Sequence, residues 1–445
     1  MATFKEYLKE EGVTTSDEMI ELDFQTHYNR PKSKLKTLAL KDGYKDNQLL
    51  GFKRTHFPWL YEVPAEFAGK IKVPHIDLDL YPRIEAMNSK ANGSILQVAV
   101  SRHTGKIAAA TMALFDFDRI YLALQKFKQE RSWSNMRLDR LRLEDFCLKH
   151  NEWYTLYIPP AELTIRSITD IGKQEEILIR LLQDYTDRFY RSLKTAYEGQ
   201  FYDIVHVKKD DDTLLKVYHF EIDNTDEGEA YKKKIEALQV LVSDGRLGEA
   251  SKWNAGQMVA ICFDSHLYYP LFAGLFDGNV PLKMRPLAFD APSEVQFVRD
   301  LEAFYKSPSG QEVIGKRSLY LLRNADTKAK GLGFALAGNF YPDFLLWLVD
   351  DTTGEQWLNF IDPKGLRQMN LDDPKLGLYK EVKVIQAKLG DPKLTLNAFI
   401  LSATRFESLI NVPCQQEDLE ERNVLFMPDG GNVYLRKMFE RVGGG

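Results

Sequence analysis

The chain has 445 residues, of which 44% are hydrophobic and 28% charged, and its formal net charge is −5 at pH 7. This composition is typical of a globular protein with about three domains of roughly 150 residues each. The negative charge excludes a general attraction to nucleic acid, so any such contact must come from a local basic patch. No apolar run approaches the ~20 residues that span a bilayer, and the charged N-terminus lacks a secretory signal. We therefore expect a cytoplasmic protein without a membrane span.

The sequence lacks complete motifs for disulfide, zinc or ATP-dependent chemistry. The three cysteines lie far apart in the sequence, which indicates neither a disulfide framework nor a CxxC metal site. The segment Gly310–Arg317 has the glycine spacing of a phosphate-binding loop, but Arg317 stands where Ser or Thr would bind magnesium. The 8 histidines show no zinc-hydrolase spacing. The sequence therefore supports neither an ATP-driven motor nor a zinc hydrolase.

Residues 1–160 are expected to form a mixed α/β module. Ser94–Val100 is mostly apolar and predicts a strand, and a helix is predicted to begin at Asp118. Basic residues then alternate with Phe127 and Trp133, a pattern that can follow a phosphate backbone and stack on bases. The candidate DNA-binding residues are Lys126, Lys128, Arg131, Arg137, Arg140 and Arg142. The alternative is a solvated helix face, because acidic residues interrupt the basic run.

Residues 161–290 predict a second α/β module. Apolar residues recur at helical spacing from Leu178 to Phe189, which predicts a helix with one packed face. Tyr202–Val207 and Leu214–Ile222 flank a run of lysines and aspartates, and they predict two strands joined by a polar turn. A further helix is predicted over Tyr231–Val242 and ends before Gly245.

Residues 291–442 differ in character and predict a third α/β domain. The expected order is helix, three-strand meander, helix and strand, with a strong turn signal at Asp350–Gly354 inside the meander. In chain order these elements are predicted at 293–305, 317–322, 340–349, 357–364, 378–389 and 398–402.

Charged residues are expected to meet at one end of this meander. Side chains alternate along a strand, so Asp362 and Lys364 project from the same face, and hairpin pairing can bring Asp343 beside them. Aspartate oxygens bind Mg²⁺, which polarises a phosphate and activates water. A lysine beside them can orient that water or stabilise the charge that develops on the phosphate. The pattern therefore predicts a site for metal-assisted phosphodiester hydrolysis.

The segments Asn339–Trp347 and Ile361–Gly365 contain Pro342-Asp343 and Asp362-Pro363-Lys364. They resemble the motifs of the PD-(D/E)xK nucleases, in particular the C-terminal endonuclease region of type III restriction enzyme Res-like proteins. Pro363 departs from the apolar residue that is commoner there. Because proline cannot donate a ladder hydrogen bond, it predicts a strand that lies at an edge or ends there.

The resemblance implies a restriction-endonuclease-like core over residues 291–442, preceded by mixed α/β modules. It also implies a glutamate on the helix before the meander, a place that Glu294 fits and for which Glu302 is the alternative. The implied catalytic residues are Asp343, Asp362, Lys364 and Glu294. Of these, Asp343, Asp362 and Glu294 are the implied ligands of Mg²⁺, with Mn²⁺ as an alternative metal.

The activity that this resemblance implies is a Mg²⁺-dependent DNA endonuclease of prokaryotic restriction or anti-phage defence. Relatives place a helicase motor before the nuclease, and this chain has no convincing motor motif, so a helicase or recognition partner is expected. The chain is then either a nuclease subunit or the C-terminal portion of a longer protein, and an oligomer is compatible with both. By family context, residues 1–290 connect, dock partners or guide DNA. The alternatives are a non-catalytic scaffold that retains a nuclease fold and a nuclease that acts on RNA.

Overall fold

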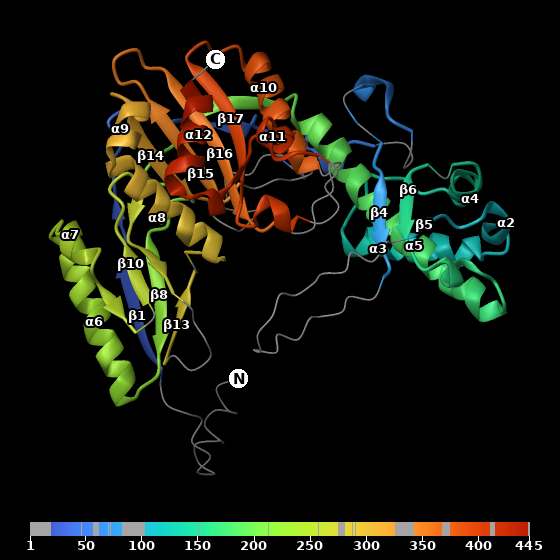
Figure 1. Cartoon of the computed structure of the whole chain (residues 1–445), viewed down its shortest axis with the longest axis horizontal. Helices are drawn as coiled ribbons and strands as arrows, with labels where there is room; N and C mark the ends of the chain where they lie inside the picture. The colour runs from blue at the N-terminus through green and yellow to red at the C-terminus, as the bar shows by residue number, and fades with distance from the viewer. Residues whose placement is uncertain are drawn as a thin grey trace. The chain divides into compact units, whose positions relative to one another are not determined.

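The computed structural model is a mixed α/β protein with several sheets, as predicted, and it divides into two compact units (Figure 1). Unit 1 comprises residues 1–39, 203–334 and 340–445, and unit 2 comprises residues 40–202 and 335–339. The structure describes residues 19–45, 47–56, 62–69, 71, 73–81, 103–150, 152–211, 213–256, 258–274, 281–286, 288–289, 291–324, 342–366, 374–409 and 414–443. The strand predicted at 94–100 and the motif residues Asn339–Tyr341 lie outside these ranges. Within the described ranges, no helix is long and apolar enough to cross a membrane.

The two units differ from the three consecutive modules expected at 1–160, 161–290 and 291–442. The hydrophobic core of unit 2 crosses residue 160, since Leu178 is buried in the same cluster as Phe146. Unit 1 crosses residue 290, because the backbone N–H of Leu267 donates to the carbonyl of Leu321 at 2.8 Å. Packing between segments distant in sequence sets these boundaries, and a shift in composition along the chain does not reveal such packing.

Unit 2 consists of helices around a small sheet. Its helices are α2 (Ala109–Met112), α3 (Phe117–Glu130), α4 (Arg140–Lys149) and α5 (Ile168–Glu198). Strands β4 (Ile76–Asp79), β5 (Thr104–Gly105) and β6 (Tyr154–Tyr157) form a sheet in the order β4-β6-β5. Helix α5 begins at a capping box made by Ser167 and Asp170, and its apolar face is buried, as the helical spacing predicted.

The first part of unit 1 contains several small sheets. The strands are β1 (Ile20–Gln25), β2 (His27–Tyr28), β3 (Lys36–Leu40), β7 (Tyr202–His206), β8 (Val217–Ile222), β9 (Asn254–Ala255), β10 (Met258–Ile261), β11 (Tyr268–Tyr269), β12 (Leu271–Ala273) and β13 (Leu282–Arg285). The helices are α6 (Asp226–Ser243) and α7 (Leu247–Ala250). The predicted strands at 202–207 and 214–222 are present as β7 and β8. They do not pair with each other, because β7 joins β3 while β8 lies between β1 and β13.

A five-stranded sheet in unit 1 positions the candidate site. Its order is β14-β15-β16-β17-β18, with β14 to β16 antiparallel and β16 to β18 parallel. The strands are β14 (Ser318–Arg323), β15 (Phe344–Val349), β16 (Gln356–Lys364), β17 (Leu394–Ser402) and β18 (Val424–Phe426). The helices of this part are α8 (Pro292–Lys306), α9 (Pro308–Ile314), α10 (Leu378–Leu389), α11 (Gln416–Glu420) and α12 (Gly431–Gly443). Helices α8, α9 and α12 pack together against the sheet (Figure 1), while α10 packs along β17.

The element order predicted for residues 291–442 is present in α8, β14 to β16, α10 and β17, with α9, α11, β18 and α12 in addition. Strand β16 lies inside the sheet, not at its edge, but it ends at Lys364 as Pro363 indicated. The carbonyl of Lys364 accepts a hydrogen bond from Ala403 after β17, so the backbone of Pro363 faces the side of β15. Strand β15 begins only at Phe344, opposite Ile361, and therefore requires no donor from Pro363.

Candidate functional site

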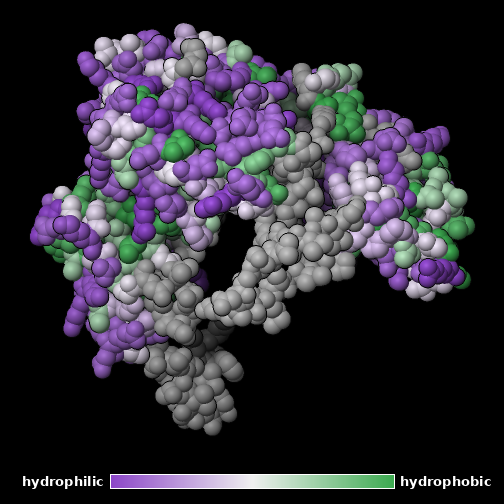
Figure 2. Space-filling model, in the orientation of Figure 1, coloured by the Kyte–Doolittle hydropathy of each residue, from purple (hydrophilic) through white to green (hydrophobic). Residues whose placement is uncertain are grey.

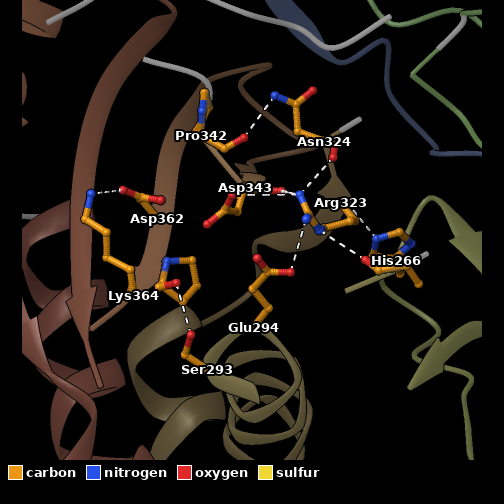
Figure 3. Close-up of polar contacts among 11 residues, drawn as sticks. His266, Ser293, Glu294, Arg323, Asn324, Pro342, Asp343, Asp362 and Lys364 are labelled. Carbon is orange, nitrogen blue, oxygen red and sulfur yellow. Dashed lines mark hydrogen bonds and ion pairs between the residues drawn. The ribbon is translucent and has the colours of Figure 1, made fainter. Parts of the chain in front are cut away.

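Two aspartates face each other at the end of the β15–β16 pair. Phe344 pairs with Ile361, and continuing this antiparallel register by one residue places Asp343 opposite Asp362. The two side chains lie close together in Figure 3, and Asp362 acts on the acidity of Asp343. The side chain of Asp362 is 8% exposed and that of Asp343 is 23% exposed. The structure thus brings together the two carboxylates that the sequence predicted.

The closeness of these carboxylates changes the acidity of Asp343. Burial and the neighbouring carboxylate of Asp362 raise the pKa of Asp343 to about 9; Glu294 contributes to the rise, and Arg323 opposes it. Two buried carboxylates in contact cannot both carry a charge without strong repulsion. Asp343 therefore keeps its proton at neutral pH, and its O–H can donate a hydrogen bond to the Asp362 carboxylate.

Lys364 completes the predicted group. Its Nζ lies 2.6 Å from Asp362 Oδ2, and its side chain is 24% exposed. The two residues are separated by Pro363 on β16, so they share a face of the strand, as the alternation of side chains predicted. The ammonium is thus bound to the buried aspartate and is still partly open to solvent, where a substrate phosphate could approach it.

Glu294 lies in the first turn of α8 and is buried. Its Oε2 is 3.1 Å from Nη2 of Arg323. The neighbouring Ser293 hydroxyl donates to the carbonyl of Pro363 at 3.2 Å, which ties the start of α8 to the end of β16. The alternative residue Glu302 lies two turns further along α8 and pairs with Lys306 at 2.6 Å. Of the two glutamates, Glu294 is the one beside the aspartates (Figure 3).

The sequence interpretation missed Arg323, a buried arginine at the end of β14. Besides its ion pair with Glu294, its Nη1 lies 3.9 Å from Asp343 Oδ1 and donates to the Asp343 carbonyl at 3.1 Å. Its position could have been a signal, because it follows the apolar run Leu319–Leu322 and pairs with Phe344. A charged residue at the end of a buried strand lies at the same end of the sheet as Asp343.

His266 positions Arg323. The backbone N–H of Arg323 donates to His266 Nε2 at 2.8 Å, so this ring nitrogen carries no proton. The proton is then on Nδ1, which donates to the carbonyl of Tyr268 at 2.6 Å. Burial lowers the pKa of His266 to about 3, so the imidazole is neutral throughout the physiological range. The neutral ring fixes the backbone of Arg323 without adding charge to the site.

The donor set fits a hard divalent cation. Asp343 and Asp362 offer carboxylate oxygens, which Mg²⁺ prefers, and a cation between them would replace the proton that Asp343 now holds. Glu294 would have to exchange its ion pair with Arg323 before it could act as a direct ligand. In the described ranges, no three His, Cys, Asp or Glu side chains are already grouped as a metal site.

The candidate DNA-binding residues lie on α3, α4 and the loop between these helices. Arg140 is bound to Asp118 at 2.8 Å, and Arg142 is bound to Glu62 at 3.0 Å. Lys126 and Arg137 are exposed. The two arginines of α4 are therefore partly neutralised within unit 2, whereas Lys126 and Arg137 present their charge to solvent.

The other members of this basic segment differ in exposure: Arg131 is exposed and Lys128 is half-buried. The guanidinium of Arg131 lies 3.6 Å from the ring centroid of Phe127, and burial lowers the pKa of Lys128. Trp133 is buried and stacks on Tyr190 with ring centroids 4.2 Å apart. Trp133 is thus part of the core of unit 2 and does not offer a free face on which a base could stack.

Comparisons of the chain with family models, curated proteins and solved structures return no match. The interpretation of the site therefore depends on its geometry and on the physical chemistry of its side chains.

We expect a Glu294→Gln variant to lower the free energy of unfolding by about 1.5–3 kcal/mol, the net contribution of a hydrogen bond to a charged group. The reason is that Glu294 and Arg323 are both buried, with side chains only 5% and 4% exposed. Glu302→Gln on the same helix is the matched control and should cost no more than about 0.5 kcal/mol. Urea unfolding of both variants measures the difference, and equal costs would show that the Glu294–Arg323 pair contributes no more than a surface pair.

Proposed function

We propose that the chain is a Mg²⁺-dependent DNA endonuclease that works with a helicase or recognition partner in restriction or anti-phage defence. The observation that carries the proposal is the contact between the carboxyl groups of Asp343 and Asp362, with the Lys364 ammonium 2.6 Å from Asp362. Two carboxylates and one partly exposed ammonium at one end of the central strands are suited to phosphodiester hydrolysis.

The residues have separate roles in this proposal. Asp343 and Asp362 would hold the metal, which when bound supplies Lewis-acid activation of the phosphate and of a water molecule. Lys364 lies at the exposed rim, where it can orient the attacking water or neutralise charge on the phosphate. Arg323 and Glu294 are positioning residues, because they hold the start of β15 and the backbone of Asp343 in place.

The fold offers independent support. The order of α8, β14 to β16, α10 and β17 agrees with the helix, meander, helix and strand that the PD-(D/E)xK resemblance implies. Parallel pairing of β16 with β17 requires a crossover, and α10 lies in that connection. The proposed ligands lie at the end of the sheet where strands β14 and β16 finish and strand β15 begins.

A nicking assay tests the proposal directly. Supercoiled plasmid is incubated with the full chain in Mg²⁺, in Mn²⁺ and in EDTA, and Asp362→Asn is run in parallel to exclude contaminating nucleases. We expect metal-dependent nicking by the wild type alone. A structured RNA and a single-stranded RNA, assayed side by side, separate a DNA nuclease from an RNA nuclease. Absence of cleavage on every substrate, with and without a helicase partner, would favour the scaffold alternative.

The exposed cations of unit 2 lead to a prediction about DNA binding. If Lys126 and Arg137 contact phosphates, replacing both by Gln should reduce the slope of log affinity against log salt by roughly 0.9 for each lost contact. Arg140→Gln is the matched control, because Arg140 is already bound to Asp118 and Glu144. Fluorescence anisotropy with a labelled duplex at several salt concentrations gives the slopes. Unchanged slopes would leave the solvated helix face as the interpretation of this segment.

A further inference from the structure

A second polar site lies at the opposite end of β16 and β17 from the aspartates. A cavity of about 710 Å³ is lined there by the first residues of both strands, by α10 and by the end of α12. The strands are nine residues long, and the aspartate pair lies at their other end. The surface over α10 and α12 is predominantly hydrophilic in Figure 2. This cavity is therefore distinct from the proposed nuclease site.

The buried amide of Asn397 lines the cavity, and the buried amide of Asn359 is hydrogen-bonded to it. Asn359 donates to the carbonyl of Leu346 at 3.1 Å, and its own Oδ1 accepts from Asn397 Nδ2 at 2.9 Å. Asn397 Oδ1 in turn accepts from Lys383 Nζ at 3.0 Å. Asn359 and Asn397 are both buried. The chain of hydrogen bonds orients the amides and holds the Lys383 ammonium at the cavity wall.

Cations outnumber carboxylates in the lining. The charged lining residues are Lys380, Lys383, Lys393, Arg441 and Glu355. Arg441 is already paired with Glu420 behind the cavity. The Lys383 ammonium has Asn397 as its hydrogen-bond partner among the described residues, and it has no carboxylate partner there. Lys383 is exposed, so its ammonium is accessible to an anion in the cavity.

Two half-buried aromatic rings complete the lining. Trp357 at the start of β16 and Tyr379 on α10 both border the cavity. Aromatic faces stack on nucleobases, and lysines bind phosphates as point charges. A cavity of several hundred Å³ is of the size that holds one small ligand. We propose that this cavity binds a free nucleotide, with its phosphate chain on Lys380, Lys383 and Lys393 and its base against the aromatic rings.

Calorimetric titration of the full chain with ATP in EDTA tests this proposal without involving metal-dependent cleavage. We expect ATP to bind, inorganic tripolyphosphate to bind more weakly and adenosine to bind most weakly. Lys383→Gln should weaken ATP binding roughly ten- to hundredfold, because it removes a hydrogen bond to a charged group. Lys388→Gln, on the same helix but outside the lining, is the control and should bind like the wild type.

The other outcomes overturn the proposal. ATP and tripolyphosphate of equal affinity would indicate an anion site without base recognition, and binding of a single-stranded oligonucleotide in the absence of ATP binding would indicate a nucleic-acid surface. Lys380 is also exposed, so Lys380→Gln provides a second variant should Lys383→Gln fold poorly. ATP affinity unchanged in both lysine variants would place the nucleotide elsewhere. Because the titration needs no metal, its result is independent of the nicking assay.

Discussion

An Asp343→Asn variant is expected to lose roughly a thousandfold or more in Mg²⁺-dependent cleavage rate, since a metal supplies several kcal/mol of transition-state stabilisation. Its stability without metal should equal or exceed that of the wild type. Asparagine resembles the protonated acid, and its amide can donate to Asp362 as the Asp343 carboxyl group does. The variant would thus lose a metal ligand without losing the hydrogen bond that stabilises the metal-free fold.

The pH dependence of stability checks the same residue without an activity assay. The pKa of Asp343 is about 9 in the folded chain, whereas an unfolded aspartate has a pKa of about 3.9. The folded chain therefore keeps a proton that the unfolded chain releases. The stabilisation from this proton is complete below about pH 4 and is lost as the pH rises to about 9. We expect the stability advantage of Asp343→Asn to grow over this window.

Asp351→Asn provides a control of opposite sign. Hydrogen bonds from Ser318 and Ser33 lower the pKa of Asp351, so its contribution is present above the unfolded pKa and is lost as the pH falls through the lower folded value. This variant should be less stable than the wild type at neutral pH, and the deficit should disappear in acid. Urea unfolding at several pH values measures both variants. If the free energies of unfolding of the wild type and of Asp343→Asn changed in parallel from pH 4 to 9, Asp343 would not hold a proton in the folded chain.

Metal binding gives a further measurement on these variants. If Mg²⁺ binds at this site, it must displace the Asp343 proton, so the Mg²⁺ affinity of the wild type should increase by up to about tenfold for each unit by which the pH is raised, up to about pH 9. Binding to the folded state raises the melting temperature as the metal concentration increases. Asp343→Asn should show a smaller rise and no such pH dependence. An equal rise in both proteins would show that Asp343 is not a ligand.

A Lys364→Ala variant is expected to cleave DNA about a hundredfold or more slowly, the cost of removing one stabilising donor from the reacting group. Mg²⁺ affinity and DNA affinity should change far less, because in the proposed mechanism the ammonium acts on the reacting phosphate and is not a metal ligand. Stability should fall by about 1.5–3 kcal/mol, since the Asp362 carboxylate is only 8% exposed and loses the ammonium bound to it. Single-turnover cleavage with bound metal and DNA separates the chemical step from binding.

Lys306→Ala is the matched control for Lys364, because it breaks an exposed ion pair with Glu302 at the same 2.6 Å separation. It should cleave at the wild-type rate. A folded Lys364→Ala protein that cuts DNA at an undiminished rate would remove the catalytic role of this lysine. The pair with Asp362 would then be structural only.

Local pattern was sufficient to predict much of the C-terminal half of unit 1. The apolar runs of β15 and β16, the turn between them and the helical spacing of α10 depend on nearest neighbours in sequence. The alternation of side chains along a strand then placed Asp362 and Lys364 on one face, and the antiparallel pairing of β15 with β16 brought Asp343 opposite Asp362. These features need only backbone geometry and hydrophobic period, both of which can be read directly from the residues.

The basic segment of unit 2 shows where such patterns stop being informative. The sequence shows lysines and arginines interleaved with aromatic residues, but it does not show which of them face solvent. Trp133 stacks on Tyr190 of α5, 57 positions later in the sequence. Arg142 binds Glu62, which lies 80 positions earlier. Burial and charge pairing are set by segments that meet only in the folded chain.

The same reason explains the electrostatics of the candidate site. Arg323, Glu294 and His266 come from three separate segments of the chain. Glu294 pairs with Arg323, and His266 binds the backbone of Arg323, because α8 and the segment that contains His266 both pack beside β14. Only that packing decides that Glu294 and not Glu302 lies beside the aspartates, and that Asp343 is buried enough to hold a proton. Residue types and their spacing are enough to propose candidate ligands of a site. The charges of those residues depend on desolvation and on pairing with distant segments, which arise only in the tertiary structure.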